Sequence, residues 1–197
     1  HDSYEALVAD SEIDAVYIAS WQVEHYEHAM LALNAGKHVL VEKPITVLPE
    51  HAKEIFALAR EKGLLAMEAM WTRYLPQSTI IRKLLASGEL GEPQLFAANF
   101  SADNRHIARL WQKGGGSIIY DMGIYPIAMS QQFLGSPSKI TATGTLHENG
   151  LDAESHSVFE YASGARAQVT ASGIATLPTT ASCSFENAVL VVAEPFF

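Results

Sequence analysis

The sequence predicts an α/β domain followed by an α+β domain, from two patterns and one change of composition. Residues 1–72 alternate short apolar strands with amphipathic helices, as in βαβ units with parallel strands and right-handed crossovers. From residue 94 onward, strand-like segments are separated mainly by turn-like sequences, which favour antiparallel pairing. The composition changes after Arg73, so we place the domain boundary between residues 1–72 and 73–197. We expect half of a doubly wound parallel sheet, then a large open antiparallel sheet.

The first domain is predicted to begin with a helix for which Ser3 is a suitable N-cap. An apolar strand then precedes a helix whose apolar side chains recur at spacings of three and four and which ends at Gly36. A second strand leads to a helix with Pro49 in its first turn and Gly63 at its end. The expected strands are residues 14–20, 39–41 and 64–70.

The second domain is predicted to start with a helix that carries Ile80, Ile81, Leu84 and Leu85 on or near one face. One further helical segment, residues 118–134, interrupts a meander of strands. The expected strands are residues 94–102, 139–146, 155–161, 165–172, 180–185 and 188–192. Their alternation leaves one sheet face available, and an open sheet must cover any apolar surface that it exposes. The residues expected to mark that face are Val158, Glu160, Tyr161, Gln168 and Thr170.

The composition argues against several classes of protein. With 197 residues, of which 48% are hydrophobic, the chain can bury a core. A net charge of -9 without basic blocks argues against nucleic acid and anionic membranes as partners. No apolar run approaches the roughly 20 residues that span a bilayer, so we expect a soluble protein. The single cysteine, Cys183, rules out an internal disulfide, fits the cytoplasm and is expected to be a buried structural thiol.

Polar residues follow the first two strands, at the edge where open α/β proteins bind ligands. The run Ser20-Trp21-Gln22-Val23-Glu24-His25 leads into a helix, whose first amides and dipole favour a polar or negatively charged ligand. Glu42-Lys43-Pro44 ends the next strand, which makes Lys43 a candidate functional residue. The local pattern leaves open that Ser20 is only an N-cap, that His25 is an exposed helix residue, and that Glu42 and Lys43 are merely solvated.

A third concentration of unusual residues runs from Gly114 to Tyr125. Its three consecutive glycines permit a close backbone approach or a flexible turn. Asp121 and Tyr125 are four residues apart and share a face if the segment is helical. A lysine ammonium beside a tyrosine would stabilise the phenolate and suit it to proton exchange with a substrate hydroxyl. The alternative is that Asp121 caps a turn and Tyr125 packs in the core, and Pro126 disfavours helical geometry at Tyr125. No metal site is predicted.

Together these motifs resemble a known family. The segments 14–19 and 35–44, with His25 and residues 114–125, are similar to motifs of the glucose–fructose oxidoreductase and inositol dehydrogenase family (Gfo/Idh/MocA). Within it, residues 68–74 and 121–125 are most similar to the branch of dimeric dihydrodiol dehydrogenases and NADP-dependent D-xylose dehydrogenases. The resemblance covers nearly the whole chain.

The resemblance implies an NAD(P)-binding Rossmann domain, with NADP favoured, and a substrate domain whose sheet forms a homodimer. It implies that Lys43 lies beside nicotinamide and substrate, that Tyr125 is the general acid/base, and that Asp121 binds or orients substrate. The residues that it places near the cofactor are Ser20, Trp21, Gln22, His25, Glu42, Lys43, Pro44, Trp71 and Arg73. The family usually has proline-asparagine where this chain has Trp21-Gln22, so the cofactor contacts there stay open.

The resulting hypothesis is hydride transfer between NAD(P) and a hydroxyl-bearing carbon of a sugar, polyol or trans-dihydrodiol. The alternative is a non-catalytic nucleotide- or sugar-sensing relative. The presence of both Lys43 and Tyr125 argues against it. The family starts with a GxGxxG turn that holds the pyrophosphate, and it continues past the last residues seen here. This chain contains no such turn, so we expect an internal fragment. The sequence does not distinguish NAD from NADP as the cofactor, and it does not identify a single substrate.

Overall fold

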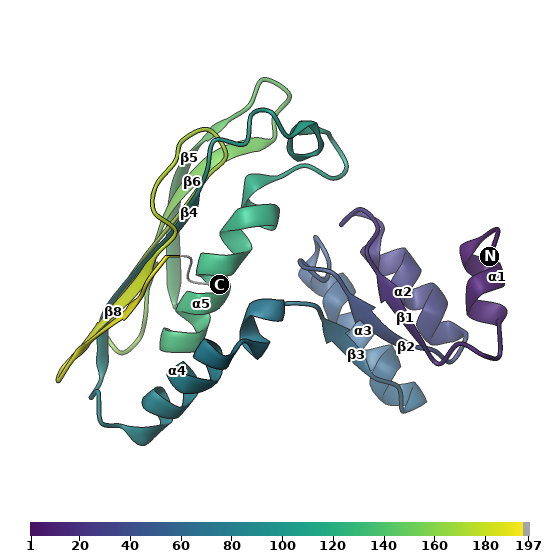
Figure 1. Cartoon of the computed structure of the whole chain (residues 1–197), viewed down its shortest axis with the longest axis horizontal. Coiled ribbons are helices and arrows are strands. Elements are labelled where there is room, and N and C mark those ends of the chain that lie inside the picture. Colours follow the sequence, from purple (N-terminus) through teal and green to yellow (C-terminus); the bar gives the residue numbers. More distant parts are fainter. Residues whose placement is uncertain (195–197) are drawn as a thin grey trace. The chain divides into compact units, whose positions relative to one another are not determined.

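The computed structural model describes residues 1–194 as two compact units, His1–Met70 and a second unit that begins at Trp71 (Figure 1). Each unit has its own sheet and is described by itself.

The first unit is a parallel sheet of three strands in the order β1-β2-β3. Its elements are α1 (Tyr4–Ala9), β1 (Ala15–Ile18), α2 (His25–Asn34), β2 (His38–Val41), α3 (Pro49–Lys62) and β3 (Ala66–Glu68). β1 pairs with β2 from Ala15↔His38 to Ile18↔Val41, and β2 pairs with β3 from Val39↔Ala66. The three strands and their parallel pairing confirm the βαβ prediction, although β1 and β3 are shorter than expected and β2 begins one residue earlier.

Local signals in the sequence set the helix ends of this unit. The Ser3 side chain accepts a hydrogen bond of 3.1 Å from the amide of Ala6, which confirms the predicted N-cap of α1. α3 has Pro49 in its first turn and ends at Gly63, whose φ of 66° is in the left-handed region that glycine adopts readily. α2 packs against α3 and against β1 and β2. The buried core between helices and sheet comprises Val8, Ile18, Ala29, Ala32, Leu33, Val39, Val41, Ile55 and Ala59.

The second unit combines helices with a sheet of six strands. Its helical elements are η1 (Trp71–Tyr74), α4 (Pro76–Ser87), η2 (Ala108–Trp111), η3 (Ile119–Gly123) and α5 (Ile124–Leu134). Its strands are β4 (Pro93–Ser101), β5 (Lys139–Leu146), β6 (Asp152–Glu160), β7 (Arg166–Ser172), β8 (Ala181–Phe185) and β9 (Val189–Val192). All six expected strands are present, with ends that differ by at most three residues.

The sheet order, β5-β6-β7-β4-β8-β9, is not the simple meander that the sequence predicted. β4 lies between β7 and β8 and pairs with β7 in parallel, whereas every other pairing is antiparallel. The prediction of a wholly antiparallel sheet was therefore wrong for one pair. Turn-like sequences report only how neighbouring strands connect, and β4 is inserted from far away in the chain.

α5 covers one face of this sheet, where it contacts β4 and β7 (Figure 1). An aromatic cluster joins the two layers, because the ring of Phe133 lies 5.3 Å from that of Phe96 and 6.3 Å from that of Phe185. Cys183 is completely buried on the same face, and burial raises the pKa of its thiol to about 12. The expected structural role of this thiol is confirmed.

The opposite face carries the alternate residues of each strand. Val158 pairs with Gln168 and His156 with Thr170 across β6 and β7. Tyr161 was expected on this face, but its side chain is buried. The reason is that adjacent residues of a strand point to opposite faces, so Tyr161 lies on the same side as the buried Phe159 and not with Val158 and Glu160. In residues 1–194, no helix is long and apolar enough to cross a membrane.

α4 provides a direct stability test, because two adjacent isoleucines differ in burial. Ile81 is 4% exposed, whereas Ile80 is 59% exposed. We predict that Ile81→Ala lowers the free energy of unfolding by about 2–5 kcal/mol, since it removes buried methyl groups and leaves a cavity. The matched change Ile80→Ala should cost less than about 1 kcal/mol. Urea unfolding of both variants measures the difference, and equal losses would contradict the described helix face.

Candidate active site

The carboxyl ends of β1 and β2 meet at one edge of the first unit. Because the strands are parallel and in register, Ser20 and Glu42 follow them at the same edge. The amide of Glu42 donates to the carbonyl of Ile18 at 2.9 Å, which extends the pairing beyond the last residues of the strands. The structure thus brings together the two polar runs that the sequence singled out.

His25 is one link between these two runs. It is fully buried at the start of α2, and its Nδ1 lies 2.9 Å from the carbonyl oxygen of Pro44. Its Nε2 lies 3.1 Å from the carbonyl oxygen of Ser20. The alternative that His25 is an exposed helix residue is therefore wrong. The imidazole fixes the loop after β1 relative to the loop after β2.

Lys43 lies in a loop that is fixed on both sides. Besides the contact of Pro44 with His25, the amide of Ile45 donates to Glu68 Oε1 at 2.8 Å, at the end of β3. The peptide bond between Lys43 and Pro44 is cis. Lys43 is half-buried, which disagrees with a merely solvated strand exit.

The Glu42 carboxylate is held by two donors. The hydroxyl of Tyr17 donates to its Oε1 at 2.5 Å, and the amide of Lys43 donates to its Oε2 at 3.1 Å. The hydrogen bond to Glu42 raises the pKa of Tyr17 above its usual value. Tyr17 has no signal in the sequence, because only the strand register shows that its side chain reaches the residue after β2.

The turn that enters α2 leaves Trp21 exposed. The amide of Trp21 donates to Glu24 Oε2 at 3.1 Å, and the amide of Glu24 donates back to the carbonyl of Trp21 at 2.8 Å. Gln22 lies within this turn and is half-buried. The hydrogen bonds of the Trp21 and Glu24 amides are therefore made within the turn, and the indole ring of Trp21 is exposed at the surface.

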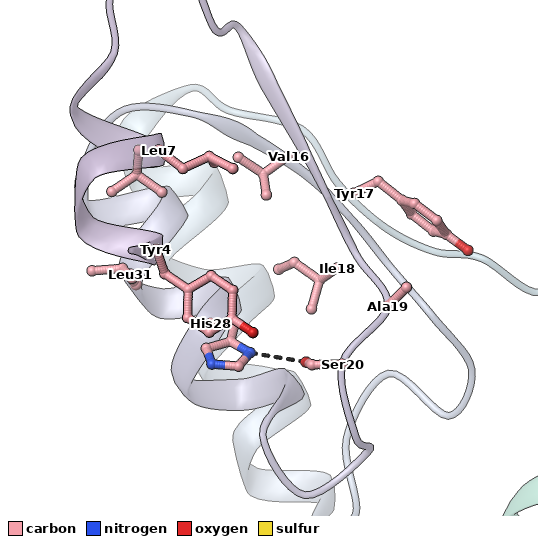
Figure 2. A pocket seen from close by; sticks show the side chains of 10 residues that line it. Tyr4, Leu7, Val16, Tyr17, Ile18, Ala19, Ser20, His28 and Leu31 are labelled. Carbon is pink, nitrogen blue, oxygen red and sulfur yellow. Dashed lines mark hydrogen bonds between the residues drawn. The ribbon is translucent and has the colours of Figure 1, made fainter. Parts of the chain in front are cut away.

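Beside this edge, β1 borders a pocket of about 280 Å³ (Figure 2). Ser20 Oγ lies 2.8 Å from Nδ1 of His28 on α2, and this is the polar contact drawn in the view. Val16 and Ile18 point toward the helices, whereas Tyr17 points to the other side of the strand. His28 had no signal of its own in the sequence, because its role depends on the packing of α2 against β1.

In the second unit, Tyr125 is almost completely buried near the start of α5. Its hydroxyl oxygen accepts a hydrogen bond of 3.2 Å from Nε1 of Trp71, and the two rings meet edge to face at 6.3 Å. The ring of Phe100 on β4 lies 5.7 Å away. Pro126 falls in the first turn of α5, where proline is tolerated, so Tyr125 is helical despite the expectation from Pro126.

Asp121 lies in η3, a π-helical turn that runs directly into α5. Such turns are rare and frequently occur at functional sites. The guanidinium of Arg109 on η2 contacts the Asp121 carboxylate at 3.3 Å. Asp121 is thus ion-paired in a helical turn, and it does not simply cap a turn. Arg109 has no signal in the sequence, because it is twelve residues from Asp121 and has no motif around it.

Arg73 has a different environment from Trp71. Its guanidinium donates to Gln131 Oε1 at 3.2 Å, and Arg82 donates to the Arg73 carbonyl at 2.7 Å. These residues and Gln132 line a polar pocket of about 270 Å³ at η1, α4 and α5. The structure therefore groups Trp71 with Tyr125, and Arg73 with the last turns of α5. Lys43 belongs to the first unit and Tyr125 to the second.

Two family models match the chain. The model described as "Oxidoreductase family, NAD-binding Rossmann fold" matches residues 1–70, and the model described as "GFO/IDH/MocA C-terminal domain" matches residues 79–191. The trans-1,2-dihydrobenzene-1,2-diol dehydrogenase of Mus musculus is 36% identical over 188 residues, which is 93% of this chain and 56% of that protein. The human enzyme of the same name is 33% identical over 99% of this chain and 59% of that protein.

Solved structures agree with this relationship. An NAD binding oxidoreductase from Klebsiella pneumoniae superposes with a TM-score of 0.85 at 26% identity, covering 98% of this chain and 57% of that chain. A 3-ketoreductase from Actinomadura kijaniata, solved with TDP-benzene and NADP, superposes with a TM-score of 0.81 at 30% identity, covering 98% of this chain and 60% of that chain.

The chain spans between 56% and 60% of the length of the curated relatives that it matches. The first family model covers the unit with the parallel sheet, and the second covers most of the unit with the mixed sheet. This chain belongs to the Gfo/Idh/MocA family of oxidoreductases.

Proposed function

We propose that the protein is an NAD(P)-dependent oxidoreductase that transfers hydride between nicotinamide and a hydroxyl-bearing carbon of a diol or sugar. The observation that carries the proposal is the environment of Tyr125. Tyr125 lies on α5, which begins directly after the turn that bears Asp121. Its phenolic oxygen accepts a hydrogen bond from Trp71. A buried phenolic oxygen that accepts a hydrogen bond from a fixed donor suits proton exchange with a substrate hydroxyl.

The first unit offers residues that fit a nicotinamide dinucleotide. The polar strand exits lie at the carboxyl edge of a parallel sheet, where such cofactors bind in doubly wound folds. Ser20, Glu42 and Lys43 would hold the cofactor there, and Trp21, Gln22 and His25 would line or support the same edge. When bound, nicotinamide supplies the hydride acceptor or donor.

The chain's own residues then supply placement and proton transfer. Tyr125 takes the proton from the substrate hydroxyl in the oxidative direction and returns it in reduction. From the family motif we infer that the Lys43 ammonium favours the phenolate form of Tyr125 and orients the hydroxyl of the substrate. Asp121 accepts a hydrogen bond from the substrate and sets its orientation. Trp71 keeps the phenolic oxygen of Tyr125 in place.

The comparisons support the substrate class and favour NADP. The named relatives act on trans-1,2-dihydrobenzene-1,2-diol, and a related structure is a 3-ketoreductase with bound NADP. Two further structures of that ketoreductase carry a lysine-to-alanine and a tyrosine-to-phenylalanine substitution. We infer a diol, polyol or sugar as substrate. The buried, reduced thiol of Cys183 is consistent with a cytoplasmic location.

We also propose that the protein is a homodimer through the open face of the second sheet. Exposed apolar side chains on that face include Leu95, Val158, Val189 and Val191. Among the described residues, Asn99 Oδ1 and Ser101 Oγ on the same face of β4 are buried and have no hydrogen-bond partner. A second copy would cover the exposed apolar groups.

The catalytic assignment predicts selective losses of turnover. In the full-length protein, Tyr125→Phe or Lys43→Met should lower kcat by about 10²- to 10⁴-fold, because proton transfer loses its donor or its electrostatic support. The matched control for the tyrosine is Tyr161→Phe, which removes the hydroxyl of another buried tyrosine in the same unit. Steady-state formation of NAD(P)H with a panel of diols and sugars measures the effect. Rates within tenfold of the parent for both active-site variants would sink the assignment.

The dimer proposal predicts that only one face of the sheet tolerates a charge. Val158→Glu on the open face of β6 should convert the full-length dimer to monomer at about ten micromolar, because it buries an unpaired carboxylate in the interface. The matched control is Ile140→Glu on β5, an exposed apolar residue whose partner Phe159 faces α5. Light scattering measures the mass. A monomeric parent, or equal dissociation by both variants, would contradict the proposed interface.

A further inference from the structure

We propose that Arg109 is a positioning residue that fixes the Asp121 carboxylate for an uncharged substrate with neighbouring hydroxyls. This inference rests on the proposed function, because it names the device by which Asp121 would orient substrate. It is carried by contacts within the second unit alone.

The guanidinium of Arg109 contacts the Asp121 carboxylate through both of its terminal nitrogens. Both terminal nitrogens of Arg109 reach Oδ1 of Asp121, at 3.3 and 3.4 Å, and Nη2 also reaches Oδ2 at 3.3 Å. The carboxylate is sheltered, with a side chain 23% exposed, whereas the guanidinium is 59% exposed. An ion pair with so open a guanidinium adds little to stability. Its clearest effect is to restrict the orientation of the carboxylate.

Packing fixes the backbone beneath both members of the pair. Leu110 follows Arg109 and Met122 follows Asp121, and both side chains are fully buried in one cluster with Ile118. The two charged residues therefore project from segments that are clamped to each other by their immediate neighbours. A long arginine side chain on a mobile loop would lose this constraint.

Gly116 makes this close approach possible. A Cβ at this position would lie 2.3 Å from the carbonyl oxygen of Leu110, a distance that real side chains do not tolerate. The amide of Gly116 also donates to the carbonyl of Gln112 at 2.7 Å. At least one residue of the triple glycine therefore serves to dock η2, with Arg109, against the segment that leads to Asp121.

The charge of the pair indicates the kind of substrate. A carboxylate whose charge is balanced by a guanidinium can accept a hydrogen bond from one hydroxyl, while the guanidinium donates a hydrogen bond to a neighbouring oxygen. Arg109 already has an anionic partner, so an anionic substrate would compete with Asp121 for it. The pair therefore suits vicinal hydroxyls of a diol or sugar better than a phosphorylated or carboxylated substrate.

The test uses the full-length protein with NAD(P) and a trans-diol or sugar substrate. Arg109→Met should raise KM for that substrate by about 10- to 100-fold, which corresponds to loss of a charged hydrogen bond. The Kd for NAD(P) should stay within about twofold, and Arg109→Lys should recover part of the loss. The matched control is Arg105→Met, which breaks the exposed Asp103–Arg105 pair in the same segment and should leave KM unchanged.

Two further measurements decide whether Arg109 acts through Asp121. Arg109→Met combined with Asp121→Asn should be no worse than Asp121→Asn alone, because the two side chains act as a unit. The Kd of the diol or sugar for the complex of the enzyme with NADPH, in which no hydride transfer to the cofactor is possible, should rise in Arg109→Met by about the same factor as KM, a readout that needs no turnover. Unchanged KM with fully additive effects, or an unchanged substrate Kd, would overturn the role of Arg109. Absence of any NAD(P)-dependent turnover by the parent would instead refute the proposed function, and the substrate Kd would still judge Arg109.

Discussion

Parallel pairing of β1 with β2 is the constraint on which the rest of the first unit depends. Because both strands run in the same direction and in register, the residues that follow them arrive at one edge. His25 then joins the two loops through the carbonyls of Ser20 and Pro44. Glu42 and Lys43 consequently extend from a rigid edge and not from a free loop. The buried imidazole of His25 thus holds the residues that follow the two strands together at one polar edge.

In the second unit, helix packing holds the hydroxyl of Tyr125 and the carboxylate of Asp121 in fixed positions. α5 is anchored on the sheet by Phe133, between Phe96 and Phe185. The π-helical turn at its start carries Asp121, and Trp71 and Phe100 surround Tyr125. The mixed sheet matters here, because the insertion of β4 between β7 and β8 puts Phe96 and Phe100 beneath the helix.

Much of this architecture could be predicted from local sequence. Alternating apolar strands and helices, with Ser3, Pro49 and Gly63 at helix ends, identified the parallel unit. The parallel pairing of β4 with β7 could not be predicted, because a strand carries no signal for its distant neighbour. The burial of Tyr161 could have been predicted, because alternation along β6 puts it on the side of Phe159 and opposite to Glu160.

The candidate site shows the same division. Motifs pointed to Lys43, Asp121 and Tyr125, whereas the residues that hold such groups in place had no motif. Tyr17, His28 and Arg109 are ordinary residue types, and their contacts arise only from register and packing. Gly116 lies in a glycine run that stood out in the sequence, but its close approach to the carbonyl of Leu110 is evident only in the folded structure.

The central claim is that Lys43 and Tyr125 serve the same hydroxyl oxygen of the substrate. The most direct measurement is a crystal structure of the full-length protein with NADP and a bound diol or sugar. The account predicts that Lys43 Nζ and Tyr125 Oη both lie within about 3.2 Å of one substrate oxygen. A ternary complex in which either atom lies beyond hydrogen-bond reach of that oxygen, with no bridging water, would contradict it.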